Sequence, residues 1–296
     1  MDETKPTHKA DKEQNLDTII AFQGEQGANS HIACRLVYPA MQTLPCATFE
    51  AAFRALQNGQ AQLAMIPVEN TVAGRVADIH RLLPGSGLYI IGEHFMPIHH
   101  CLLGLKNSKL ENISHIHSHE MALGQCRKLI AKLQAKPIIT ADTAGAAREI
   151  AALGDPNHAA IASSLAAEIH DLAILQENTE DMGHNTTRFL IMANQAAYAD
   201  PDEALVITSF IFRARNVPAA LYKALGGFAS NGVNMTKLES YQLEGSFTAT
   251  MFYADIEGHP ENEAVRLALE ELRFFCSKVD ILGVYKADPF RTTLKA

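Results

Sequence analysis

The sequence has little of what marks several classes of protein. It contains no tryptophan, aromatic residues make up 7% of it, and no apolar run approaches the roughly 20 residues of a membrane span. Basic residues number 25 against 33 acidic ones, which gives a net charge of −8. A net negative chain argues against nucleic acid as a partner. We therefore expect no nucleic acid and no membrane among its partners, and any anionic ligand must be held by local groups.

Cysteines are few and show no paired spacing. The five thiols are best interpreted as buried and unpaired in a reducing compartment: Cys34, Cys46, Cys101, Cys126 and Cys276. Residues 1–17 are polar with mixed charge and lack the apolar segment of a secretory signal. We expect these residues to form a disordered N-terminal tail and the protein to be cytoplasmic.

The next part of the chain alternates short apolar runs with amphipathic segments, which predicts an α/β fold of parallel sheets covered by helices. Residues 89–105 form a long apolar stretch interrupted by Pro97, His99 and His100. We interpret this stretch as strands crossing between two lobes. Lobe one then comprises about 18–98 plus 178–195, and lobe two about 99–177. A cleft between two lobes is the default place for a small ligand.

Glycine and small polar residues follow the first predicted strand, 18–22. Gly24 and Gly27 mark a tight turn, and Ser30 precedes a helix predicted over 32–38. The free N–H groups of such a helix start can hold a carboxylate. The third glycine of a dinucleotide-binding loop and the Gly-Lys-Ser/Thr of a P-loop are absent, so an ordinary strand–helix turn is the alternative.

A second buried strand, predicted over 63–68, delivers Glu69, Asn70 and Thr71 at its end. Asn70 can both donate and accept hydrogen bonds, and a hydroxyl at Thr71 can contact a ligand. This arrangement faces a ligand in one interpretation. In the other, Asn70 and Thr71 only cap a following helix that extends through Leu83.

The stretch 184–192 begins with small polar groups and one fixed cation and continues as an apolar run. Phe189–Met192 reads as a buried strand, so Thr186, Thr187 and Arg188 are expected at its entrance. Strand ends facing a cleft are where α/β folds hold their ligands. Taken alone, the stretch also fits a loop with a solvated Arg188.

Three histidines, His115, His117 and His119, alternate along a predicted strand, which would place three imidazoles on one face. This spacing could bind zinc. No carboxylate or cysteine motif accompanies the histidines, so we expect no metal site.

Residues 193–203 are a polar linker, and residues 204–286 form a unit of their own. Apolar patterns and turn residues predict the order strand, helix, strand, strand, helix, strand, with a turn at Glu244 and Gly245. This βαββαβ order is ferredoxin-like.

Four motifs in register resemble the prephenate dehydratase family over roughly residues 19–192. They are Gly24–Gly27 with Ser30-His31, Pro67–Thr71 with Gly74, Ser118-His119 with Gln125-Cys126, and Asn185–Phe189. The resemblance implies a two-lobed, periplasmic-binding-protein-like catalytic domain, followed by a ferredoxin-like ACT domain, an amino-acid-sensing module. It implies a cofactor-free enzyme that converts prephenate to phenylpyruvate, water and carbon dioxide.

The resemblance also implies roles for individual residues. Thr187 would be catalytic, donating to the leaving hydroxyl. The substrate-binding residues would be Ser30, Glu69, Asn70, Thr71, Ser118, Gln125 and Arg188. Arg188 would either clamp a substrate carboxylate or tie the strand entrance to a buried acid.

In the C-terminal unit, the resemblance implies that phenylalanine binds and regulates the enzyme, in a homodimer or homotetramer. The residues implied are Ala219, Ala220, Leu221, Asn231, Gly232, Val233, Asn234, Glu239 and Ser240. Ala219 stands where the family has glycine, and Tyr241-Gln242 stand where it has Arg-Pro, so the effector or its strength could differ. The alternative for this unit is an assembly module without a ligand.

Two other functions stay open for the whole chain. One is arogenate dehydratase, which performs the same elimination on the transaminated substrate and needs a group that recognises an ammonium. The other is a catalytically silent two-lobed small-molecule binding protein.

Overall fold

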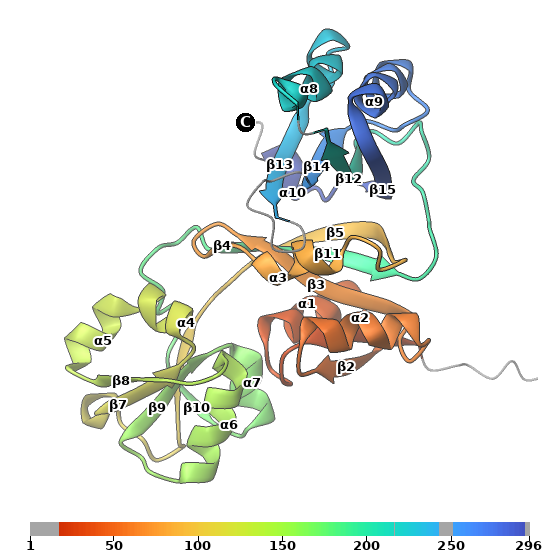
Figure 1. The fold of residues 1–296 in the computed structure, drawn as a ribbon. Helices are drawn as coiled ribbons and strands as arrows, with labels where there is room; N and C mark the ends of the chain where they lie inside the picture. Colours follow the sequence, from red (N-terminus) through yellow and green to blue (C-terminus); the bar gives the residue numbers. More distant parts are fainter. Residues whose placement is uncertain (1–17, 216, 243–250, 294–296) are drawn as a thin grey trace, which may run out of the picture.

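The computed structural model describes residues 18–215, 217–242 and 251–293. It shows two lobes and a C-terminal unit, which packs on lobe one on the side away from lobe two (Figure 1). The expected N-terminal tail and the expected turn at Glu244 and Gly245 lie outside the described residues. Among the described residues, no helix has the length and apolarity needed to cross a membrane.

Lobe one is a sheet in the order β2-β1-β3-β11-β5, with β4 paired to β3, and three helices pack on it. Its elements are β1 (Ile19–Gln23), α1 (Asn29–Val37), β2 (Gln42–Cys46), α2 (Phe49–Gln57), β3 (Leu63–Asn70), β4 (Gly74–Arg75), α3 (Ala77–Leu82), β5 (Tyr89–Pro97) and β11 (Thr186–Ala193). Thr48 caps α2, because its hydroxyl accepts a hydrogen bond from Ala51 N.

Lobe two has the sheet order β10-β6-β9-β7-β8. Its elements are β6 (Cys101–Gly104), a 3₁₀ turn (Leu110–Asn112), β7 (His115–Ser118), α4 (Glu120–Gln125), α5 (Arg127–Leu133), β8 (Lys136–Ile139), α6 (Thr143–Leu153), β9 (His158–Ala162), α7 (Ser164–Ile169) and β10 (Ala173–Gln176). The side chains of Asp142 and Ser163 cap α6 and α7 by accepting hydrogen bonds from Gly145 N and Ala166 N.

The C-terminal unit is a four-stranded antiparallel sheet in the order β13-β14-β12-β15, with α8 and α9 on one face. Its elements are β12 (Val206–Ala214), α8 (Ala220–Ser230), β13 (Met235–Tyr241), β14 (Met251–Glu257), α9 (Glu263–Phe275), β15 (Cys276–Lys286) and α10 (Phe290–Thr293). The predicted βαββαβ order is therefore confirmed. The face of the sheet that α8 and α9 leave uncovered packs on lobe one.

Lobe one and the C-terminal unit share one hydrophobic core. Ile211 and Tyr253 of the C-terminal sheet lie in the same buried cluster as Leu190 of lobe one. The two units approach closely at Gly283 on β15, where an added Cβ would overlap the carbonyl oxygen of Ile90 on β5. Only glycine fits at this crossing.

Four expectations from the sequence are wrong in detail. Both lobe sheets are mixed, because β11 runs antiparallel to β3 and β5, and β6 and β10 run antiparallel to their neighbours. The first helix begins at Asn29, three residues before the predicted start. The strand β11 begins at Thr186, so Thr187 and Arg188 lie within it rather than at its entrance. The spacing of Leu123, Ile130 and Leu133 predicts one helix after residue 119, but the structure has two, α4 and α5, which meet at Cys126.

The break between α4 and α5 has a long-range cause. The carboxylate of Asp181, on the segment that returns to lobe one, accepts hydrogen bonds from Arg127 N and Lys128 N at 3.0 and 3.1 Å, while Asp181 N donates to Gln125 O at 2.6 Å. One residue thus terminates α4 and caps α5. The five thiols are free and buried, as expected.

Candidate active site

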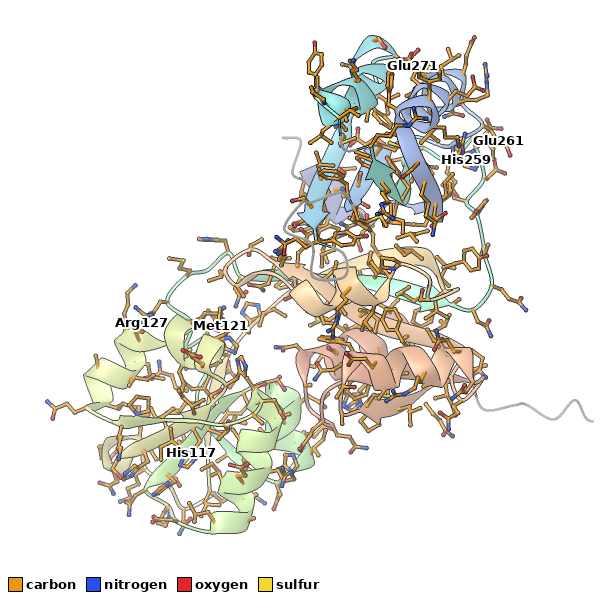
Figure 2. The ribbon with its side chains drawn as sticks, viewed as in Figure 1. His117, Met121, Arg127, His259, Glu261 and Glu271 are labelled. Carbon is orange, nitrogen blue, oxygen red and sulfur yellow. The ribbon has the colours of Figure 1, made fainter. Side chains whose placement is uncertain are left out.

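A cleft of about 270 Å³ lies between the two lobes. Lobe one lines it through β1, the start of α1, β3 and β11, and lobe two lines it through α4 and the start of α6. The lining side chains include Ser30, Asn70, His100, His119, Met121, Gln125, Asp142, Asn185 and Thr187. Figure 2 shows Met121 on the side of lobe two that faces lobe one. No lysine or arginine from the described residues lines this cleft.

Strand register brings Thr187 and Asn70 together. Thr187 on β11 pairs with Asn70 on β3, so both side chains emerge on the same face of the sheet, toward the cleft. Asn70 Oδ1 accepts from Val72 N at 2.9 Å and from Ala73 N at 2.7 Å, which fixes the orientation of this amide. Its Nδ2 therefore donates to Thr187 Oγ1 at 2.9 Å. Because the Thr187 oxygen already accepts this bond, its own proton is free to point at a ligand.

The hydrogen bonds continue from Asn70 across the cleft into lobe two. Asn70 Nδ2 also donates to Asn185 Oδ1 at 2.7 Å, and Asn185 Nδ2 donates to Gln125 Oε1 at 2.9 Å. The ring Nε2 of His100 lies 2.8 Å from the same Gln125 oxygen. The side-chain amides of Asn70 and Asn185 thus link Thr187 to Gln125 at the end of α4, and His100 joins the network at Gln125.

Anionic groups can be held at the start of α1. Ala28 precedes this nine-residue helix, and no side chain among the described residues caps it. Asn29 and Ser30 of its first turn line the cleft, and the free N–H groups and dipole of a helix start favour a carboxylate. Asp142 is the one acidic side chain that the described residues place in the cleft, and its Oδ1 is engaged in capping α6.

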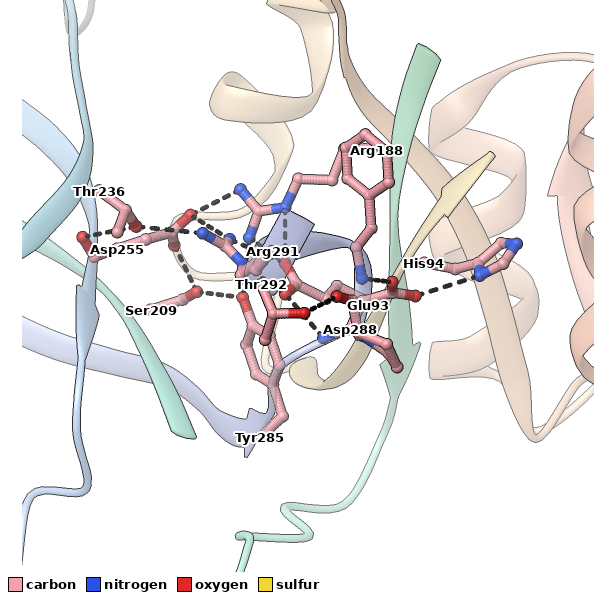
Figure 3. Close-up of polar contacts among 12 residues, drawn as sticks. Glu93, His94, Arg188, Ser209, Thr236, Asp255, Tyr285, Asp288, Arg291 and Thr292 are labelled. Atoms are coloured by element: carbon pink, nitrogen blue, oxygen red, sulfur yellow. Dashed lines mark hydrogen bonds and ion pairs between the residues drawn. The ribbon is translucent and has the colours of Figure 1, made fainter. Parts of the chain in front are cut away.

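Arg188 points away from the cleft, because successive strand residues face opposite sides of the sheet. It is 2% exposed, and it donates from Nε to Glu93 at 2.8 Å and from NH1 to Asp255 of the C-terminal unit at 2.6 Å (Figure 3). NH2 donates to the Tyr285 hydroxyl at 3.0 Å. Arg188 therefore ties β11 to buried acids, as in the second of the two roles weighed for it, and does not line the cleft.

Burial and neighbouring charges have opposite effects on the pKa values of Arg188 and Asp255. Burial would raise the pKa of Asp255, but the Arg188 charge and a hydrogen bond from Ser209 hold it below its ordinary value. Burial would lower the pKa of Arg188, but Asp255 and its other neighbours raise it well above the ordinary value. The two groups are thus a buried ion pair between lobe one and the C-terminal unit.

The tail after β15 completes this interface. Arg291 of α10 donates from Nε to Glu93 Oε1 at 2.5 Å and from NH2 to Glu93 Oε2 at 2.9 Å. Phe290 stacks on Phe95 of β5 with ring centroids 5.0 Å apart. We call Glu93, Arg188, Asp255, Tyr285 and Arg291 the interdomain charge cluster.

Three further expected substrate-binding residues do not reach the cleft. Glu69 lies on the Arg188 face and accepts from Arg188 at 3.1 Å and from Lys237 of β13 at 2.5 Å. The Thr71 hydroxyl donates to His184 O at 2.6 Å and accepts from Thr186 N, which fixes the β3–β4 turn against β11. Ser118 is fully buried and donates to Ile161 O at 2.6 Å. These three side chains are thus engaged outside the cleft, whereas Ser30, Asn70, Gln125 and Thr187 line it.

The expected row of three histidines is also wrong. His115 and His117 lie on one face of β7, beside His158 of the neighbouring strand β9. His158 stacks on His115, and its Nδ1 lies 2.9 Å from His117 Nε2. His119 lies beyond the strand, caps α4 by accepting from Met121 N, and lines the cleft. Within the part of the chain that the structure describes, no group of three or more histidines, cysteines or carboxylates is placed to hold a metal.

The residues expected to bind an amino-acid effector lie at the two ends of α8 and on β13. Ala219 precedes α8 with φ +60°, and Gly232 follows it with φ +67°. Asn231 closes the helix by donating to Gly227 O at 2.8 Å. Glu239 accepts from Lys237 and from Arg75 of lobe one, and Arg75 also donates to Ser240 O.

The cleft residues that sequence reasoning missed include His100 and Asn185. Both lie on the segments that cross between the lobes, and both are 4% exposed. The signals that point to them are positional: His100 follows the break after Pro97, and Asn185 directly precedes Thr186 and Thr187.

A two-lobed α/β fold with a polar cleft between the lobes defines a class of proteins that enclose one small molecule. Residues 20–197 match the family described as prephenate dehydratase. A bifunctional N-acyl-homoserine lactone acylase/prephenate dehydratase of Komagataeibacter europaeus is 51% identical over 277 residues, which cover 94% of this chain and 99% of that protein. The chloroplastic arogenate dehydratase/prephenate dehydratase 1 of Arabidopsis thaliana is 36% identical, over 92% of this chain and 73% of that protein.

Among solved structures, the prephenate dehydratase of Arthrobacter aurescens in complex with L-Phe is 29% identical, with a TM-score of 0.83 over 90% of each chain. The chain belongs to the prephenate dehydratase family. It is an enzyme, a carbon–oxygen lyase of that family, and the alternative of a catalytically silent binding protein is set aside.

Proposed function

We propose that the enzyme converts prephenate to phenylpyruvate in phenylalanine biosynthesis and that its C-terminal unit, an ACT domain, responds to phenylalanine. The observation that carries the reaction is the Thr187 hydroxyl in the wall of the interlobe cleft. Its oxygen accepts from Asn70, so its proton is the part of the group left to face a substrate.

The chemistry needs little from the protein beyond placement. The bond between the ring and its carboxylate breaks, its electron pair becomes part of the aromatic ring, and the ring hydroxyl leaves from the opposite carbon. The departing hydroxide takes up one proton to become water, and carbon dioxide is released. Aromatisation drives the step, so the residues need only hold the dianion, exclude water and donate to the departing oxygen.

The cleft residues divide this work. The uncapped start of α1, near Asn29 and Ser30, suits one substrate carboxylate. Thr187 donates to the leaving oxygen. A threonine hydroxyl is a weak acid, so its contribution is a placed hydrogen bond in a dry cleft rather than a matched pKa.

Arogenate is the alternative substrate, and it differs by carrying an ammonium in place of the keto group. The name of the Arabidopsis relative includes both activities, arogenate dehydratase and prephenate dehydratase. Asp142 is the acidic side chain in the cleft that could accept from that ammonium. We favour prephenate because the Asp142 carboxylate is already used to cap α6.

Parallel assays of the pure protein with prephenate and with arogenate test this proposal. We expect a higher kcat/KM for prephenate, and Asp142→Asn should change the ratio of the two values by less than threefold. A higher kcat/KM for arogenate that Asp142→Asn abolishes would make the enzyme an arogenate dehydratase.

Phenylalanine control is supported by the L-Phe complex of the Arthrobacter relative and by the contacts of Glu239 and Ser240 with Arg75 of lobe one. An effector changes activity only if it favours one arrangement of the domains over another. Titration of phenylalanine by calorimetry, beside tyrosine and tryptophan, tests the binding. We further expect a homodimer or homotetramer, which light scattering of the pure protein measures.

A second candidate activity is amide hydrolysis of N-acyl-homoserine lactones, because the Komagataeibacter relative carries that name at 51% identity. A second cavity of about 580 Å³ adjoins the cleft and shares Gln23, Gly24 and Asp142 with it. This gives room for a ligand longer than prephenate. Release of homoserine lactone from an acylated substrate by the pure protein supports this candidate, and no release above a buffer blank excludes it.

A further inference from the structure

Two backbone N–H groups determine which atom donates and which accepts in each hydrogen bond of the cleft. Val72 N and Ala73 N both donate to Asn70 Oδ1, so the Asn70 amide nitrogen must face Thr187 and Asn185. Asn185 therefore accepts through Oδ1 and donates through Nδ2. The atom of Gln125 that faces Asn185 Nδ2 must in turn be its oxygen.

These donor and acceptor assignments determine which ring nitrogen of His100 carries a proton. Gln125 Oε1 already accepts from Asn185 at 2.9 Å, and His100 Nε2 lies 2.8 Å from the same oxygen. A nitrogen at that position must donate, so His100 carries its proton on Nε2.

The backbone of His100 is held as firmly as its ring. His100 N donates to Glu180 Oε2 at 2.9 Å, and His100 O accepts from the Thr179 backbone N at 2.8 Å and from its hydroxyl at 2.9 Å. These bonds join the two segments that cross between the lobes. His100 is also 4% exposed. The ring therefore has a fixed place at the junction of the lobes.

We propose that His100 is a positioning residue for the elimination: its Nε2–H holds the Gln125 side chain with the oxygen toward Asn185 and the NH2 group toward the cleft. Among the described residues, Gln125 Nε2 has no hydrogen-bond partner, and Gln125 lines the cleft. The orientation thus presents amide donors to an anionic substrate in a cleft that no lysine or arginine of the described residues lines. This inference rests on the proposed function.

Burial supports the same protonation state. Desolvation lowers the pKa of His100, although the bond to Gln125 and the charge of Glu180 oppose this shift. A neutral ring with its proton on Nε2 donates to Gln125 and leaves Nδ1 as an acceptor.

The test compares two substitutions of His100 whose side chains differ in length, His100→Gln and His100→Asn. The amide nitrogen of His100→Gln can occupy the place of Nε2, whereas the shorter side chain of His100→Asn cannot reach Gln125. We expect kcat/KM for prephenate to stay within about threefold in His100→Gln and to fall about tenfold or more in His100→Asn, the effect of one lost hydrogen bond. His115→Asn, in the body of lobe two, is the matched control and should retain full activity.

A double-variant cycle separates positioning from a general structural effect. If His100 acts through Gln125, His100→Asn should add little to the loss caused by Gln125→Ala. Fully additive losses, or equal losses in His100→Gln and His100→Asn, would overturn the proposal.

Nitrogen-15 NMR of the histidine rings in the wild-type protein tests the inference without any variant. We expect the His100 signal of a neutral ring protonated at Nε2 near pH 7, and a proton on Nδ1 alone would contradict it. This measurement does not depend on turnover. An inactive wild-type protein with the expected signal would refute the proposed function and leave the arrangement of His100 standing.

Discussion

Thr187 and Arg188 are neighbours on β11, and their side chains leave the strand on opposite faces. Thr187 lines the interlobe cleft, and Arg188 lies in the interdomain charge cluster beneath the C-terminal unit. Their partners on β3 divide in the same way, since Asn70 pairs with Thr187 and Glu69 with Arg188. A shift of β11 or β3 caused by the C-terminal unit would therefore move the group that faces the substrate.

Arg188→Met should destabilise the protein strongly. It leaves Asp255 buried without its main cation and removes one of the two arginines that pair with Glu93. Breaking a buried ion pair in this way typically costs about 3–5 kcal/mol. Urea denaturation should show the loss. Arg75→Met is the matched control, because the Arg75–Glu239 pair is half exposed on the arginine side and such pairs contribute about 0–1 kcal/mol.

The double variant Arg188→Met with Asp255→Leu should recover part of that stability, because the buried carboxylate is then also removed. An Arg188→Met protein that unfolds at the wild-type urea concentration would show that the charge cluster does not hold the two units together.

Ala219→Gly should stabilise the C-terminal unit slightly. Ala219 adopts φ +60°, where a Cβ costs about 1–2 kcal/mol and glycine has no such penalty. The greater freedom of glycine in the unfolded chain offsets about 0.5–1 kcal/mol of this gain. Ala229→Gly is the control, because Ala229 lies in the helical backbone of α8. This substitution should lower the free energy of unfolding by about 1 kcal/mol.

The same change tests the regulatory proposal. Removing the methyl group at Ala219 restores the residue that the family has at this position, so phenylalanine should bind more tightly by calorimetry. If Ala219→Gly lowers the melting temperature as Ala229→Gly does, the account of this turn is wrong.

Stability should fall as the pH drops below about 6.5. Burial lowers the pKa of His31, His100, His117 and His170 below their unfolded value of about 6.5. Between the folded and unfolded pKa values, the unfolded chain binds more protons, so each fall in pH favours unfolding. Thermal melts between pH 8 and pH 5 should be flat at first and then decline, and a constant melting temperature down to pH 5 would contradict this.

The fold was largely readable from the sequence because its signals are local. Thr48, Asp142 and Ser163 cap their helices through bonds that span three residues. The buried runs predicted most strands of all three sheets, and the order of the C-terminal unit followed from its turns and apolar periods.

The errors at the site come from long-range contacts or from a misplaced strand end. The polar residues Thr186, Thr187 and Arg188 suggest the entrance of a strand rather than its interior, so the sequence does not show the alternation that points Arg188 away from Thr187. Ser118 was expected in the cleft, but the adjacent strand offers its hydroxyl the Ile161 carbonyl. The cap that Asp181 gives to α5 spans 54 residues, and no local pattern contains it.

The central claim is that the Thr187 hydroxyl donates to the leaving group in the interlobe cleft. Turnover of prephenate by Thr187→Ala tests it most directly, followed as phenylpyruvate absorbance in base, with Thr187→Ser and Thr186→Ala as controls. We expect kcat to fall about a hundredfold in Thr187→Ala, the usual effect of losing one placed donor, and to stay near wild type in both controls, with all melting curves unchanged. Near-full turnover by a folded Thr187→Ala protein would contradict the account.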